Sequence, residues 1–184
     1  MSLLETQNFL AKVFTDEILR GKFLSEPLKI GKENNLSETE IEQIRQLLPE
    51  QIKFFADSLL YKRLHEVEKF LPLTRKMLDK DFEIYFREFA NQFLPKTIKR
   101  HLEDAIKFCD FLQARENGWL KDLIIFEQAR LIFNGYGKRF LLRVFQYNIK
   151  EICRRDAKAQ SDFPQRKTFA VWLKIGRRNR HFIW

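Results

Sequence analysis

The chain of 184 residues is 45% hydrophobic and 32% charged, and its net charge is +9. This length suits one domain, or one domain with an appendage, and the hydrophobic content excludes a chain that is disordered throughout. No stretch approaches the roughly 20 apolar residues of a membrane span, and the N-terminus lacks the basic start of a signal peptide. We therefore expect a cytoplasmic protein in which Cys109 and Cys153 are reduced, buried thiols.

The excess positive charge is confined to the C-terminal quarter. Residues 138–184 hold 13 Lys and Arg against 3 Asp and Glu, whereas residues 1–137 hold 21 against 22. A segment with a net charge of +10 favours an acidic partner. Nucleic acid, an acidic protein surface and anionic lipid would each fit this description.

Helices are predicted over most of the chain. A capping box at 2–5 opens the first, and Asp16 can cap a second that ends near Gly21 or before Pro27. Residues 27–35 are expected to form a loop. A second capping box, from Ser37 to Glu40, precedes a series of segments with helical spacing of apolar residues. These segments are 38–48, 50–71, 73–79, 82–93, 97–115 and 119–133.

Phenylalanine is abundant, with 19 in the chain, and aromatic residues recur through 82–93. Such a stripe could line a ligand pocket. We interpret it as core packing instead, because Phe buries a large apolar area and helical spacing of this kind is typical of a core face.

The pattern changes after residue 135. Residues 139–147 have strand character, and Asn148 can cap a short helix that reaches about Lys158. Residues 168–175 and 180–184 are interpreted as a hairpin around 176–179. In this hairpin Leu173 would face Phe182, Val171 would face Trp184, Trp172 would meet Ile183 and Lys174 would meet His181. Val171, Leu173 and Phe182 would then point toward the core.

The sequence thus predicts a mainly α fold with a small C-terminal antiparallel β element. We divide it into a helical body over 1–135 and a basic α+β module over 136–184 that ends in the hairpin. Within the body, short helices occupy 1–48 and long helices occupy 50–134.

No catalytic or metal-binding motif is present. His65, His101 and His181 form no HxH, HExxH or Cys–His cluster, and the chain has no nucleophile elbow, P-loop or dinucleotide fingerprint. Gly135 and Gly137 are interpreted as a helix stop and a turn. We expect no metal, no cofactor and no enzymatic activity, although an active site assembled from distant residues would not show in a sequence.

Two basic segments are candidates for binding. Tyr61–Arg63, with Lys69 and Arg75–Lys76, could form a patch, but the acidic residues between them favour a solvated helix face. The hairpin tip is the second candidate, since Arg177 and Arg178 lie there. Two helices, a strand and a hairpin with an arginine tip follow the order of a winged-helix protein. The would-be recognition helix, 119–133, is however too apolar for a major groove. A solvated hairpin whose charge protects an edge strand is the alternative.

Three segments resemble a known group of proteins. They are FADSLLYKRLHEVEKFLPLTRKML (55–78), HLEDAIKFCDFL (101–112) and AVWLKIGRRNRHFIW (170–184), and the N-terminal helices with 36–48 also look similar. The group consists of small bacterial helical proteins of largely unknown function. These are similar to the proteins described as DNA-binding that accompany multinuclear iron enzymes modifying peptides, as in methanobactin biosynthesis. The resemblance implies a helical head, a C-terminal α+β module that helps present a peptide, and catalysis by another subunit.

We therefore expect a non-catalytic partner protein that binds a protein or peptide through its C-terminal β module. Basic side chains would steer an acidic partner, and aromatic side chains would supply anchors. The alternative is a nucleic-acid-binding regulatory protein that uses the same arginines. The candidate binding residues are Trp172, Lys174, Arg177, Arg178, Arg180 and Trp184. The identity of the partner and the oligomeric state do not follow from the sequence.

Overall fold

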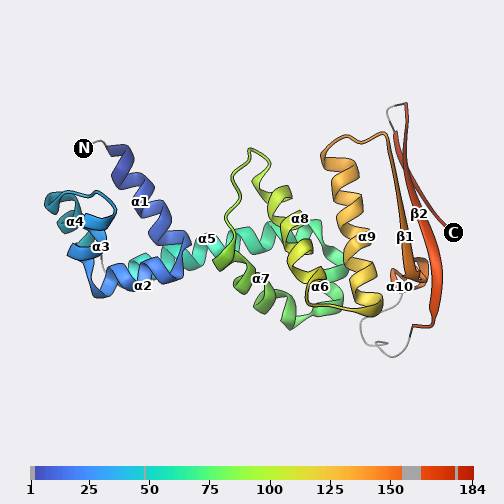
Figure 1. Ribbon diagram of the computed structural model, residues 1–184, viewed down its shortest axis with the longest axis horizontal. Coiled ribbons are helices and arrows are strands. Elements are labelled where there is room, and N and C mark those ends of the chain that lie inside the picture. Colours follow the sequence, from blue (N-terminus) through green and yellow to red (C-terminus); the bar gives the residue numbers. More distant parts are fainter. Residues whose placement is uncertain (1–2, 48, 155–162, 177) are drawn as a thin grey trace. The chain divides into compact units, whose positions relative to one another are not determined.

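The computed structural model describes residues 3–47, 49–154, 163–176 and 178–184. The chain is mainly α and ends in a three-stranded antiparallel sheet, which confirms the predicted fold class (Figure 1). Within the described ranges, no helix combines the length and the hydropathy that crossing a lipid bilayer requires. The elements are α1 (Leu3–Thr15), α2 (Glu17–Ser25), α3 (Pro27–Glu33), α4 (Glu38–Arg45), α5 (Pro49–Phe70), α6 (Pro72–Leu78), α7 (Lys80–Gln92), α8 (Arg100–Gln113), α9 (Gly118–Gly135), β1 (Phe140–Tyr147), α10 (Ile149–Ile152), β2 (Gln165–Ile175) and β3 (Arg178–Ile183).

Two compact units make up the chain. The first comprises Met1–Arg63 with Ala90–Leu94, and the second comprises Leu64–Phe89 with Pro95–Trp184. This boundary differs from the expected one between residues 135 and 136. The sheet shares one hydrophobic core with α6 and α9, so the basic module and the helices before it fold as a single unit.

The first unit corrects one expectation. Residues 27–35 were expected to form a loop, but Pro27–Glu33 is helix α3. Pro27 stands in the first turn, where its missing N–H costs nothing. Ile30 is buried in the core of this unit, and a Cβ on Gly31 would overlap the side chain of Ile41. The lysines and asparagines of this segment suggested a loop, whereas the buried side of the helix decides its structure.

Helix α4 begins with the predicted capping box. The N–H of Ser37 donates to Glu40 Oε2 at 2.9 Å, and the N–H of Glu40 donates to Ser37 Oγ at 3.3 Å. The hydroxyl of Thr6 in α1 also donates to Glu40 Oε1 at 2.6 Å. These bonds to the ionised carboxylate lower the pKa of Glu40 to about 2, with the Ser37 hydroxyl contributing most. The capping box therefore also ties α4 to α1.

Aromatic packing fills the helical part of the second unit. The ring of Phe108 lies 5.2 Å from Phe82, 5.3 Å from Phe86 and 5.4 Å from Phe89, measured between centroids. All four side chains are buried. The interpretation of the stripe in α7 as core packing is confirmed.

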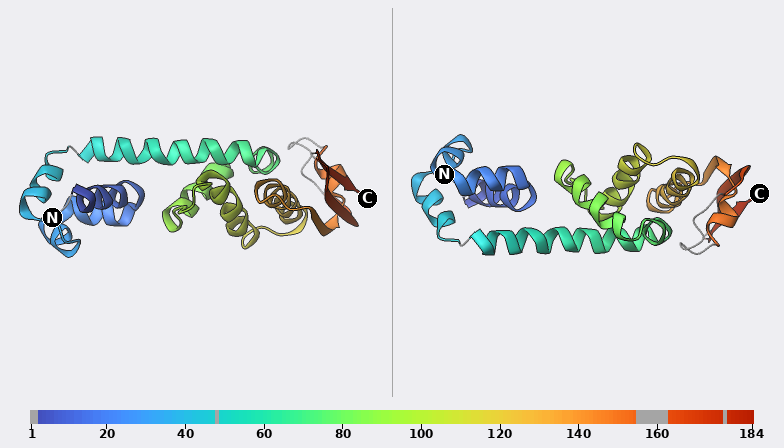
Figure 2. Two further views of the ribbon diagram at one scale, coloured as in Figure 1. Left: turned by 90° about the horizontal axis from the view of Figure 1, so that it is seen from above. Right: turned by 90° about the horizontal axis from the view of Figure 1, so that it is seen from below.

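The sheet has the order β1-β2-β3, and α9 lies beside one of its faces (Figures 1 and 2). Phe126 and Phe133 of α9 share a buried cluster with Phe145 of β1 and Trp172 of β2. We call the side of the sheet toward α9 the inner face. Helix α10 ends at Ile152, and the expected continuation to Lys158 falls largely on residues 155–162, outside the described ranges.

Candidate functional site

A buried carboxylate anchors the sheet on α9. Asp122 Oδ2 accepts hydrogen bonds from the N–H of Gln146 at 2.6 Å and from the N–H of Tyr147 at 2.9 Å. These two residues lie where the register between β1 and β2 shifts. Because a bulge leaves backbone groups without a ladder partner, the carboxylate replaces the missing acceptor. Burial raises the pKa of Asp122, although both backbone bonds act in the opposite direction.

The other side of the sheet carries apolar side chains in three rows. The rows follow from the strand register and alternate with the inner-face residues. We call this surface the outer sheet face. Its rows are Val144–Phe169–Trp184, Leu142–Val171–Phe182 and Phe140–Leu173–Arg180.

The outer sheet face is exposed. Trp184 is 65% accessible, Phe140 57% and Val144 53%, whereas Val171 and Leu173 in the centre are half-buried by their neighbours. In the second unit, no described helix or strand lies on this side of the sheet (Figure 2). A contiguous apolar surface of this kind is uncommon on a soluble protein and is typical of an interaction site.

Two aromatic rings at the end of the chain are held in place. The rings of Phe182 and Trp184 are stacked at 5.9 Å with an interplanar angle of 23°. The backbones of Phe169 and Trp184 exchange two hydrogen bonds of 3.0 Å, so the last residue continues the ladder of β3. The two rings therefore form a preformed part of the outer sheet face.

Basic side chains border this face. Arg178 and Arg180 are exposed on this side of β3, whereas Lys174, which pairs with Asn179, is exposed on the inner side near the hairpin turn. None of the three forms an ion pair with a residue in the described part of the chain. Arg180 lies on the outer sheet face itself, opposite Leu173. Arg177 is outside the described residues. The surface thus combines apolar side chains with positive charges that have no intramolecular counterion in the described structure.

Of the two tryptophans that were predicted to bind a partner, only Trp184 is on the surface. Trp172 is 2% exposed and packs against Phe126 of α9, with 5.5 Å between ring centroids. The prediction that Trp172 contacts a partner from an open position is therefore corrected, because its side chain belongs to the core. The structure places Trp184, Arg178, Arg180 and Lys174 at accessible positions of β2, β3 and the chain end.

The predicted hairpin register was also wrong. Val171, not Leu173, faces Phe182, and Trp172 faces His181. The hairpin turn is two residues shorter than expected, because Ile175 already pairs with Arg178. Phe182 and the half-buried Val171 and Leu173 lie on the outer sheet face, while Ala170 and Trp172 point to the core.

Sequence reasoning missed the contribution of β1 and of the first half of β2. Phe140, Leu142, Val144 and Phe169 lie on the outer sheet face but were not among the candidate residues. The sequence RFLLRVFQY does alternate, yet both sets of alternate positions contain apolar residues. A strand with apolar residues on both sides, in a small sheet with helices on one side, is the signal that could have located this face.

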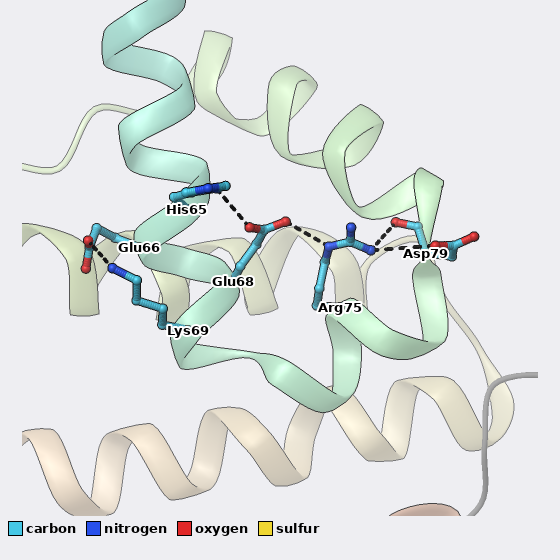
Figure 3. Close-up of polar contacts among 6 residues, drawn as sticks. All are labelled: His65, Glu66, Glu68, Lys69, Arg75 and Asp79. Carbon is cyan, nitrogen blue, oxygen red and sulfur yellow. Dashed lines mark hydrogen bonds and ion pairs between the residues drawn. The ribbon is translucent and has the colours of Figure 1, made fainter.

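In the basic patch predicted from Tyr61–Arg63, Lys69 and Arg75–Lys76, Lys69 and Arg75 are paired with acidic neighbours (Figure 3). Lys69 Nζ lies 2.6 Å from Glu66, and Arg75 Nε lies 2.8 Å from Glu68, which also accepts from His65. Arg75 Nη1 donates to the carbonyl oxygen of Asp79 at 2.8 Å. These pairs favour the interpretation of this region as a solvated helix face.

Other chemistry is not indicated by the described residues. They contain no group of three or more His, Cys, Asp or Glu that could hold a metal ion. Cys109 and Cys153 are free thiols, as expected, and burial raises the pKa of Cys153 to about 11. A thiol with a raised pKa is a poor nucleophile at neutral pH. Cys109 is fully buried, whereas Cys153 is only partly so.

The first unit contains an apolar pocket of about 690 Å³ between α1 and the start of α5. Phe14, Phe54 and Phe55 line it together with Leu47 and Ile52. Among the described residues of its lining, Glu50 is the only charged one.

Comparisons with known proteins add no family. No protein-family model matches the chain, and no curated protein matches it in sequence. The resemblance to the partner proteins of peptide-modifying iron enzymes rests on the three quoted segments and the N-terminal helices. The functional argument therefore depends on the outer sheet face.

Proposed function

We propose that the protein is a non-catalytic partner protein that binds an acidic protein or peptide through its C-terminal sheet. The observation that carries this proposal is the outer sheet face, where exposed apolar side chains from three strands form one surface. Aromatic residues dominate binding energy at protein interfaces, and Phe140, Phe169, Phe182 and Trp184 supply them here.

Charge indicates which kind of partner fits. Residues 138–184 carry a net charge of +10, so this surface would repel a second copy of itself and attract an acidic segment. Arg178 and Arg180 lie on the edge strand, where they can steer such a segment to the apolar centre. We therefore favour an acidic, apolar partner over self-association.

The edge of the sheet offers backbone groups as well. Since Phe169 and Trp184 exchange both hydrogen bonds, alternate residues of β3 point their N–H and C=O groups away from β2. These residues are Asn179, His181 and Ile183. An extended peptide can add to such an edge as a further strand, with main-chain hydrogen bonds supplying affinity.

Peptide selection from a random display library tests the proposal. The bait is the full chain, and the matched bait is the double variant Phe169→Ala/Phe182→Ala, which removes only half-exposed rings. We expect acidic peptides with alternating apolar residues to be enriched on the wild type and not on the variant. Equal enrichment on both baits, or none on either, would contradict the proposal.

Single-stranded nucleic acid is a second candidate, because bases stack on exposed aromatic rings beside basic side chains. The stacked pair Phe182–Trp184, next to Arg180, is the observation that favours it. Insertion of α9 into a duplex groove lacks support, since Leu123, Ile124 and Phe126 of this helix are buried.

Fluorescence anisotropy of labelled single-stranded and duplex DNA across a salt series separates the two candidates. Nucleic-acid binding predicts a log affinity that falls linearly with log salt, with a slope of about −0.7 per contacted phosphate for single strands. Arg178→Ala/Arg180→Ala would then weaken binding and flatten the slope. A peptide partner predicts DNA binding no tighter than the non-specific level.

A further inference from the structure

A pocket lies on the inner face of the sheet, beneath its free edge. Its volume is about 260 Å³, and its lining comes from α6, α9, β2, β3 and Cys153, the residue that follows α10. Leu73, Phe126, Trp172 and Ile183 supply apolar walls, and His181 stands at the β3 side. This pocket is on the opposite side of β3 from the outer sheet face, so it is a separate site.

The size of the pocket suits one side chain. Sites for whole small-molecule ligands usually span about 300–1,000 Å³, which is larger than this cavity. A single aromatic or long aliphatic side chain that enters such a pocket is the usual anchor of a protein interface. The volume therefore favours an anchor residue over a cofactor.

The lining is close to neutral. Glu127 is fully buried there, but it accepts from the N–H of Leu73 at 3.2 Å and lies 3.3 Å from Arg130 Nη2. Its charge is thereby compensated within the protein, and a charged occupant would find no partner. An uncharged apolar side chain is the occupant that these walls accept.

One group in the wall has no partner. The indole N–H of Trp172 is buried and has no hydrogen-bond acceptor within the described structure. Buried donors are nearly always paired in folded proteins. The nitrogen is inaccessible, however, so this N–H gives an occupant of the pocket no polar contact.

The pocket adjoins the backbone groups that β3 leaves free. His181 and Ile183 line the pocket, and they are also residues whose N–H and C=O groups point to the open edge. A strand that adds beside β3 directs alternate side chains to the inner face, next to these two residues. Its other side chains would extend the outer sheet face.

We propose that the pocket receives one large apolar side chain of an acidic segment that adds to β3, and that this anchor sets which peptides bind. The proposal rests on the function proposed above and specifies its ligand: an extended segment with an uncharged aromatic or long aliphatic residue on the inner side. Recognition then uses both faces of the sheet edge.

The test uses synthetic copies of peptides selected on the wild-type chain. His181→Trp places a large ring at the pocket, and the control Ile84→Trp places the same ring at an exposed position of α7, outside the pocket lining and the sheet. We expect His181→Trp to weaken binding about tenfold or more, in the range of an anchor residue, and Ile84→Trp to change it little. Melting curves of both variants show whether they remain folded.

Alanine replacement along the peptide gives a second readout that does not depend on any protein variant. One apolar position should lose about tenfold or more in affinity on the wild type. It should lose much less on His181→Trp, because the pocket is already filled. The anchor is refuted if every apolar position of the peptide tolerates alanine and His181→Trp binds with normal affinity. If Phe169→Ala/Phe182→Ala still abolishes binding in that case, the proposed function stands without the anchor. Failure to select any peptide refutes both.

Discussion

The carboxylate of Glu127 accepts a hydrogen bond of 2.7 Å from the backbone N–H of Thr74, a residue 53 positions earlier in the chain. Thr74 is in the first turn of α6. The N-cap residue of this helix, Leu71, has a side chain that cannot accept a hydrogen bond. A side chain from α9 thus caps α6 from outside. Arg130, one turn further along α9, donates to the carbonyl oxygen of Phe70 at 2.7 Å and holds the end of α5.

Replacing Glu127 should destabilise the second unit strongly. Glu127→Ala leaves the N–H groups of Leu73 and Thr74 without an acceptor, and we expect a loss of about 2–3 kcal/mol in the free energy of unfolding. Trp119, Trp172 and Trp184 all belong to the second unit, so tryptophan fluorescence during chemical denaturation reports on that unit alone. An unchanged denaturation midpoint would show that the cap contributes nothing.

Stability should also depend on pH through Glu127. Burial raises the pKa of Glu127 above its ordinary value of 4.5, although the bonds from Thr74 and Leu73 and the charge of Arg130 act in the opposite direction. The folded chain therefore keeps this proton to a higher pH than the unfolded chain does. The free energy of unfolding falls as pH rises from 4.5 through the raised pKa, and it stays lower above it. Glu127→Gln should remove this part of the slope, which denaturation series at several pH values can measure.

Glu40 should produce the opposite slope in the first unit. The hydrogen bonds from Ser37 and Thr6 lower its pKa to about 2. The ionised carboxylate therefore makes its full contribution to the free energy of unfolding at pH values above the ordinary pKa of 4.5. This contribution is lost as pH falls from 4.5 toward 2. The protection factors of the α4 amides, corrected for the intrinsic exchange rate at each pH, should fall over this range in the wild type. In Glu40→Gln the same amides should have lower protection factors already at neutral pH and show little further change.

The two tryptophans of the hairpin should differ sharply. Trp172→Ala creates a cavity beside Phe126, and we expect a loss of about 3–5 kcal/mol. Trp184→Ala removes a side chain that is 65% exposed, and its effect should stay within about 0.5 kcal/mol. Chemical denaturation followed by circular dichroism measures both. Similar losses for the two variants would contradict the assignment of inner and outer faces.

The sequence predicts the helices of this fold well. Ser37 and Glu40 mark the start of α4, and the spacing of Phe82, Phe86 and Phe89 predicts the buried side of α7. Local rules of capping and periodicity were sufficient there, because the relevant partners lie within one or two turns. Helix α3 was missed since its evidence is the contact of Gly31 with Ile41, which no local pattern reveals.

The sheet was harder, and the candidate site depends on it. In β2 the more apolar set of alternate residues, with Phe169, Val171 and Leu173, lies on the outer sheet face, whereas Trp172 shares the inner side with small and polar residues. Alternation alone therefore predicts the wrong side of β2 for the core. Packing against α9 decides which side of β2 faces the core, because the ring of Trp172 contacts Phe126 of this helix. A two-residue change in turn length keeps the same side chains on each face but changes the partners, which is why Phe182 pairs with Val171.

The affinity of a selected acidic peptide for the wild-type chain and for Phe169→Ala/Phe182→Ala tests the central claim most directly. Ile18→Ala is the matched control, because Ile18 is an exposed apolar residue of the first unit. We predict a loss of about tenfold or more for the double variant and no change for the control, with all three chains equally folded by melting. Equal affinity for the wild type and the double variant would contradict the assignment of the outer sheet face as the binding surface.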